Sequence, residues 1–145
     1  MQKFYLQERN KDFYTVYEQI RKESVKKGGY LSVEEISKKA VMRPAQSYYI
    51  SKQAIYKVIL RRRCMRDDGH RQKCLCDAIF KEYFEIKKQH PDYCPNKIAG
   101  MIELLPAPRF YMSDRTASIL AYQLIKTNGN AIFNSNAFYN RIFSI

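Results

Sequence analysis

Residues 44–51 read Pro-Ala-Gln-Ser-Tyr-Tyr-Ile-Ser, and residues 106–113 read Pro-Ala-Pro-Arg-Phe-Tyr-Met-Ser. The two octets lie 62 residues apart and are identical at Pro, Ala, Tyr and Ser. Two further positions hold similar side chains, because Tyr48 is matched by Phe110 and Ile50 by Met112. This agreement predicts an internal repeat, and the repeat decides how the rest of the chain is divided.

The match continues toward the N-terminus, where Ile36 aligns with Ile98, so that the two copies span roughly residues 13–63 and 76–126. Within each copy the apolar residues recur at spacings of three and four, as on one face of a helix. In the first helix of the two copies these residues are Phe13, Val16, Tyr17 and Ile20, and Cys76, Ile79, Tyr83 and Ile86.

A second helix is expected to begin after Ser32 in the first copy and after Cys94 in the second. Ser32-Val-Glu-Glu35 has the form of a capping box, and Pro95 fits a first helical turn, where its missing N–H group has no cost. Because a proline disfavours helix at the residue before it, Pro44 and Pro106 predict that these helices end by about Met42 and Leu104. In the first copy the inward residues are Val33, Ile36, Ala40 and Val41.

A third helix is expected after each octet, with Ser51 and Ser113 as its N-caps. Its inward residues are Ala54, Ile55 and Val58 in the first copy and Ala117, Leu120 and Leu124 in the second. Asp67-Asp68-Gly69 and Asn128-Gly129-Asn130 are chain breakers that end the two copies.

The sequence therefore predicts an all-α protein of two tandem three-helix repeats packed together, with a short C-terminal extension. The expected divisions are a first repeat at 1–66, a basic connector at 67–75, a second repeat at 76–130 and a tail at 131–145 that packs on the core. The three-helix unit resembles helix-turn-helix domains in architecture. Its connection between the second and third helices, roughly residues 43–49, is longer than the usual turn, so the likeness is one of architecture alone.

The charge points to the class of partner. The chain of 145 residues carries a net charge of +12, which favours nucleic acid over cationic or neutral small molecules. Residues 1–60 contribute +6, residues 61–75 contribute +4 and residues 76–145 contribute +2. A segment of 15 residues therefore holds a third of the net charge, and the second repeat is nearly balanced.

The third helix of the first repeat is the expected nucleic-acid contact. On a helical wheel its outer face is basic and hydrogen-bonding, and its N-terminus offers N–H groups and a positive dipole end to a phosphate oxygen. Lys52 and Gln53 are the candidates for base edges, with Tyr56 on the same face. The candidates for phosphate contacts are Lys57, Arg61, Arg62, Arg63, Arg66, Arg71 and Lys73, joined in the second repeat by Arg109 and Arg115. A solvated helix face is the alternative for the third helix, and for Arg109 the alternative is pairing with a helix C-terminus or a carboxylate.

The third helix of the second repeat presents a mixed surface, on which Ile119, Tyr122 and Ile125 lie beside polar residues. This surface favours a protein contact, either with a partner or with another copy of the chain. The chain could then be an RNA-binding or scaffolding accessory subunit of a nucleic-acid enzyme, which is the alternative to duplex DNA binding.

Other functions have weaker signals. Cys64, His70, Cys74 and Cys76 lack the C-x2-C spacing of zinc knuckles, so no metal or other cofactor is expected. Phosphate-loop and hydrolase motifs are absent and only two histidines are present, so we do not expect an enzyme. No apolar run is long enough to span a bilayer, and no signal peptide is recognisable, so a cytoplasmic protein with no membrane partner is expected.

Overall fold

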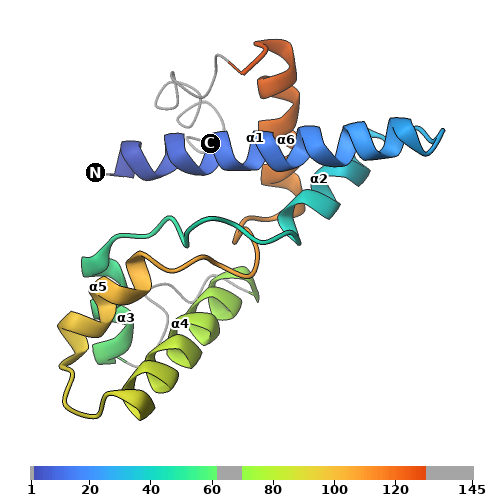
Figure 1. Cartoon of the computed structure of the whole chain (residues 1–145). Coiled ribbons are helices and arrows are strands. Elements are labelled where there is room, and N and C mark those ends of the chain that lie inside the picture. The colour runs from blue at the N-terminus through green and yellow to red at the C-terminus, as the bar shows by residue number, and fades with distance from the viewer. Residues whose placement is uncertain (1, 62–69, 130–145) are drawn as a thin grey trace. The chain divides into compact units, whose positions relative to one another are not determined.

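The computed structural model describes residues 2–61 and 70–129, and this part of the chain is built from helices, with no named strand (Figure 1). The helices are α1 (Gln2–Lys26), α2 (Val33–Val41), α3 (Lys52–Arg61), α4 (His70–Gln89), α5 (Pro95–Glu103) and α6 (Asp114–Lys126). The expected all-helical class is confirmed for these residues. None of these helices is both long and apolar enough to cross a membrane.

Local capping sets the ends of the short helices where the sequence places them. Ser32 Oγ accepts a hydrogen bond from Glu35 N at 3.2 Å, which is the N-cap half of the expected capping box. The Glu35 carboxylate accepts from the Ser32 hydroxyl at 3.1 Å. The helices before the two octets end with C-caps at Met42 and Leu104, two residues before each proline. Helix α5 begins at Pro95 after Cys94, whose side chain makes no capping hydrogen bond.

The third helices also begin at their predicted caps. Ser51 Oγ accepts from Ala54 N at 3.2 Å, and Ser113 Oγ accepts from Thr116 N at 3.1 Å. Helix α6 ends in a turn in which Gly129, at a φ of 87°, donates from its N–H to Leu124 O at 2.8 Å. A positive φ at this position is open to glycine without strain, which explains the chain breaker expected there.

The second part of the expected connector at 67–75 is helical. Helix α4 begins at His70, so residues 70–75 form its first turns. Asp67-Asp68-Gly69 lies outside the described residues, as does the C-terminal tail at 131–145.

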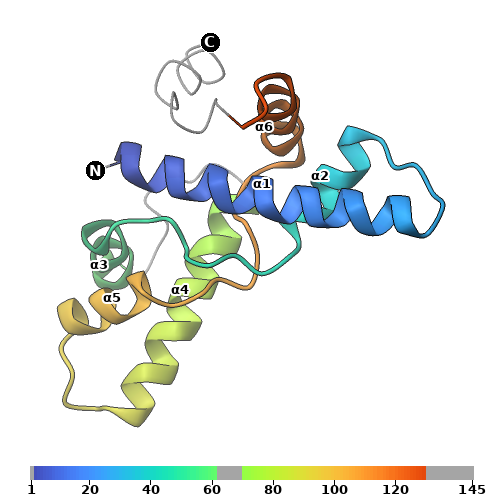
Figure 2. The ribbon, with the colours of Figure 1, turned by 45° about the horizontal axis from the view of Figure 1, so that its top comes forward.

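The helices form two compact units that differ from the two consecutive repeats. Unit 1 contains residues 1–46 and 107–145, and unit 2 contains residues 47–106. Helices α1 and α2 therefore share a unit with α6, whereas α3 lies with α4 and α5. In both views the orange-red α6 accompanies the blue α1 and the cyan α2 (Figures 1 and 2). The expected packing of each repeat as its own body is not confirmed, because each unit takes its third helix from the other repeat.

Unit 1 has a core of aliphatic and aromatic side chains from all three of its helices. Helix α2 packs against both α1 and α6, and the Phe13 ring of α1 meets the Phe110 ring edge-on at 5.8 Å. The buried apolar residues are Phe13, Tyr17 and Ile20 of α1, Ile36, Ala40 and Val41 of α2, Ala45 after α2, Ala107, Phe110 and Met112 before α6, and Ala117, Leu120, Ala121 and Leu124 of α6. Val33, expected on the inward face of α2, is only half-buried.

The two octets meet inside unit 1. Ala45 and Ala107, which occupy the same position in the repeat, form an antiparallel bridge in which each N–H donates to the other carbonyl at 3.0 Å. Gln46 N donates to the buried Asp12 carboxylate at 2.9 Å, and Phe110 N donates to Val41 O at 2.9 Å. The bridge joins the segment that leaves unit 1 after Gln46 to the segment that returns to it at Ala107.

Unit 2 is a continuous three-helix segment in which α3 packs against both α4 and α5. Its buried apolar residues are Tyr48 before α3, Ile55, Val58 and Ile59 of α3, Cys76 and Ile79 of α4, and Ile98, Ala99 and Ile102 of α5. Tyr83 and Ile86, expected on the inward face of α4, are partly exposed.

Candidate nucleic-acid interface

Helix α3 has a buried stripe and an exposed basic face. Ile55, Val58 and Ile59 are buried, whereas Gln53, Lys57 and Arg61 are exposed. The helix contains no acidic residue, and neither Lys57 nor Arg61 makes an ion pair with another residue of the described chain. Three of the predicted contact residues therefore share an open cationic and hydrogen-bonding face.

The buried residues of α3 differ in part from those that the helical wheel predicts. Ala54, expected inside, is only half-buried, and Ile59 takes the buried position. Leu60, with 55% of its surface exposed, stands among the polar residues of the outer face. The helical wheel could have predicted the exposure of Leu60, since Leu60 lies three residues from Lys57 and therefore on the same side of the helix.

The N-terminus of α3 is not open to a phosphate in the way that the sequence indicated. Lys52 N donates to the Glu103 carboxylate of α5 at 2.6 Å, so a protein carboxylate already occupies the positive end of the helix. Lys52 itself is only partly exposed, and its Cε atom lies 3.4 Å from where a Cβ on Gly100 would be. The side chain of Lys52 thus follows α5, and Gln53 is the more open candidate for a base edge.

Glu103 is the site residue that the sequence did not reveal. It lies 51 residues from Lys52, so no spacing rule connects the two. Helix α6 has its counterpart in Asp114, an acidic residue of its own first turn. Both third helices therefore carry a carboxylate near their positive ends, one from a distant segment and one from the helix itself.

The remaining predicted contacts divide between the two units. Arg62, Arg63 and Arg66 lie outside the described residues. Arg71 and Lys73 fall in the first turns of α4, in the same unit as α3, although their side chains are not among those described. Tyr56 is half-buried on α3.

Arg109 and Arg115 belong to unit 1, whereas the predicted contact residues of α3 belong to unit 2. Arg109 is partly buried: its Nε donates to Phe110 O at 3.3 Å, and its guanidinium lies 5.8 Å from the centre of the Tyr111 ring. These contacts are with a loop carbonyl and an aromatic ring, and not with the helix C-terminus or the carboxylate of the alternative, so a phosphate contact at Arg109 stays a prediction. Arg115 is exposed on the first turn of α6.

The expected protein-binding surface on α6 is partly used within unit 1. Tyr122 is 50% exposed, but its hydroxyl donates to the Glu34 carboxylate of α2 at 2.7 Å. This hydrogen bond lowers the pKa of Glu34 and raises the pKa of Tyr122 relative to their ordinary values. Ile125 is 41% exposed and Ile119 is half-buried, so the apolar part of this surface is small.

No group of three or more metal-binding side chains occurs among the described residues. Cys64 and the side chain of His70 lie outside them, so the expectation that these residues hold no zinc is not tested. No protein-family model, curated protein or solved structure matches the chain. Its function is therefore argued from its own residues.

Proposed function

We propose that the protein binds nucleic acid, with duplex DNA as the first candidate, through the exposed face of α3 and the arginine-rich segment that follows it. The observation that carries this proposal is the pairing of a buried apolar stripe with an open face of Gln53, Lys57 and Arg61 on a helix without acidic residues. A helix of this kind can place an amide at base edges while its cations reach phosphates on either side.

The residues that follow α3 in the sequence add further cations for phosphate contacts. Arg61 is followed directly by Arg62 and Arg63, and Arg66 comes three residues later. The net charge of +12 supplies a long-range attraction to any polyanion. Helix α6 is less suited to this role, because the Tyr122 hydroxyl on its surface is already bound to Glu34.

The proposal predicts a strong dependence of binding on salt. Four to six phosphate contacts give a slope of about −4 to −5 in a plot of log K against log salt concentration. The measurement is a fluorescence-anisotropy titration of a labelled duplex at several salt concentrations, repeated with single-stranded DNA and with structured RNA. A flat salt response would remove the proposal, and a preference for RNA would favour the accessory-subunit alternative.

A pair of matched variants separates the α3 face from net charge alone. Lys57→Glu/Arg61→Glu and Lys38→Glu/Lys39→Glu change the net charge equally, and all four side chains are exposed. The α3 variant is expected to weaken binding at least tenfold and to reduce the salt slope by about 2, because two phosphate contacts are lost. The α2 variant is expected to have a much smaller effect. Equal losses in the two variants would show that α3 has no special part.

A further inference from the structure

The outer face of α3 carries an exposed leucine among polar side chains. Leu60 is 55% exposed, and Gln53 and Lys57 on the same face are exposed as well. Gln53 lies seven residues before Leu60, which is almost two full turns, so the two side chains leave the helix in nearly the same direction. Lys57 lies between them along the helix, and Arg61 follows Leu60 directly. Leu60 is therefore part of the face proposed to meet DNA.

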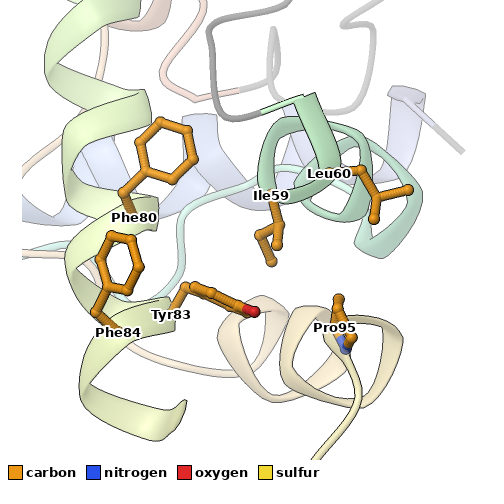
Figure 3. A pocket seen from close by; sticks show the side chains of 6 residues that line it. All are labelled: Ile59, Leu60, Phe80, Tyr83, Phe84 and Pro95. Carbon is orange, nitrogen blue, oxygen red and sulfur yellow. The ribbon is translucent and has the colours of Figure 1, made fainter. Parts of the chain in front are cut away.

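The side chain of Leu60 projects away from the core of unit 2. It is one of the residues that line an apolar hollow beside α3, together with its neighbour Ile59 and the α4 residues Phe80 and Phe84. Ile59 is buried. Figure 3 shows Leu60 leaving α3 on the side away from the Phe80 and Phe84 rings. More than half of the Leu60 surface is thus available to a ligand.

The repeat offers a comparison for this position. At the offset of 62 residues Leu60 corresponds to Tyr122, whose hydroxyl donates to Glu34 at 2.7 Å within unit 1. A leucine has no group that could make such a hydrogen bond, and the residue of α5 that corresponds to Glu34 is Asn96. The position that joins α6 to α2 in unit 1 therefore holds, in unit 2, an apolar group without that role.

The charges on α3 indicate what kind of surface Leu60 meets. The helix has no acidic residue, and its exposed charged side chains, Lys57 and Arg61, are cationic. The Glu103 carboxylate contacts α3 at Lys52 N, which lies about 12 Å from Leu60 along the helix axis. An apolar partner surface would leave the two cations without counter-charges. The major groove of duplex DNA is flanked by phosphates and presents an apolar group at its base edges, the 5-methyl group of thymine.

We infer that α3 reads thymine through its 5-methyl group, which packs against Leu60, while Gln53 hydrogen-bonds an adenine in the same groove. This inference rests on the proposed binding of duplex DNA, and it names the favoured sequences as those rich in A·T pairs. Leu60 and Gln53 are about 10 Å apart along the helix, which is about three base pairs of DNA. Thymine also separates DNA from RNA, because uracil lacks the methyl group and the major groove of RNA is too deep and narrow for side chains to read.

The test compares two duplexes that differ only in this methyl group. The A·T duplex alternates adenine and thymine, and in the A·U duplex deoxyuridine replaces every thymidine. Alternation places a thymine three positions from every adenine, so no knowledge of a target sequence is needed. Anisotropy titrations with the full-length protein at one salt concentration measure both affinities. The A·T duplex is expected to bind about fourfold more tightly, which is the effect of burying one methyl group.

Three variants locate the source of the preference. Leu60→Ala is expected to lower the affinity for the A·T duplex to that for the A·U duplex, and the exposure of Leu60 leaves little risk to folding. Leu104→Ala is the matched control, because Leu104 is 82% exposed in the same unit but lies at the C-cap of α5. It is expected to keep the fourfold preference. Gln53→Ala is expected to weaken binding of both duplexes by the same factor, because Leu60 is still present.

The outcomes separate this inference from the proposal on which it rests. If the wild-type protein binds the two duplexes equally, or if Leu60→Ala keeps the fourfold preference, Leu60 does not read thymine and this inference alone is overturned. Equal weakening of both duplexes by Leu60→Ala would likewise show a contact that does not involve the methyl group. Failure to bind either duplex, or tighter binding of structured RNA, would overturn the proposed function together with this inference.

Discussion

Removal of the Glu103 carboxylate should have opposite effects on the stability of unit 2 and on nucleic-acid binding. Glu103 accepts from Lys52 N at 2.6 Å and places a negative charge at the N-terminus of α3. A hydrogen bond to a charged group contributes about 1.5 to 3 kcal/mol, and the partial exposure of Lys52 favours the lower end of that range. Glu103→Ala should therefore cost about 1.5 kcal/mol, whereas Glu103→Gln keeps an acceptor oxygen and should cost about 0.5 kcal/mol.

Thermal unfolding followed by circular dichroism measures the stability effect. A loss of 1 kcal/mol lowers the Tm of a domain the size of unit 2 by about 4 to 8 °C. Glu85→Gln is the matched control, because Glu85 is exposed on α4 and its removal changes the net charge equally. The reasoning fails if Glu103→Gln lowers the Tm as much as Glu103→Ala does, or if all three variants have the same Tm.

The same variants measure how the helix end contributes to binding. Glu103→Gln frees the positive end of α3 from a fixed carboxylate, which should tighten duplex DNA binding about two- to fivefold relative to Glu85→Gln. The two proteins have the same net charge, so anisotropy titrations at one salt concentration compare them directly. Equal affinities would show that DNA does not approach this end of α3.

Three further predictions concern unit 1. Ser37 is fully buried, and its hydroxyl has no hydrogen-bond partner in the described chain, so Ser37→Ala should stabilise the protein by about 1 kcal/mol in urea unfolding; a lower midpoint would reveal a missed partner. The pKa of Glu34 is lowered by the hydrogen bond from Tyr122, so the folded state gains from its ionised form at neutral pH and loses that gain as the pH falls through the lowered pKa. Tyr122→Phe should therefore flatten the acid side of the stability profile, and an unchanged profile would contradict this assignment. Ala107→Pro removes the N–H that donates to Ala45 O at 3.0 Å, and since Ala45 is buried the substitution should cost about 1 to 3 kcal/mol; wild-type thermal stability would show that the bridge is dispensable.

The sequence predicted the features that neighbouring residues determine. The N-cap at Ser32, the helix ends at Met42 and Leu104 and the caps at Ser51 and Ser113 all agree with the structure. Each depends on groups within about four residues of one another, so the local sequence is sufficient to set it. The open face of α3 was predictable for the same reason, because helical spacing alone separates Lys57 and Arg61 from the buried stripe.

The carboxylate at the N-terminus of α3 was not predictable from local sequence. Glu103 reaches Lys52 from α5, and Tyr122 reaches Glu34 from α6 across 88 residues of sequence. Such contacts depend on which helices are neighbours, and no spacing along the chain encodes that choice.

The sequence by itself therefore determined that there are helices, where most of the short ones begin and end, and that the positions of two octets correspond. Only the tertiary structure decided that α6 completes the unit of α1 and α2, and that α3 completes the unit of α4 and α5. The physical reason is that hydrophobic burial is non-directional, so either third helix offers an acceptable apolar stripe to either pair. The choice between them depends on long-range contacts, including the Ala45–Ala107 bridge and the Glu103 carboxylate at the start of α3.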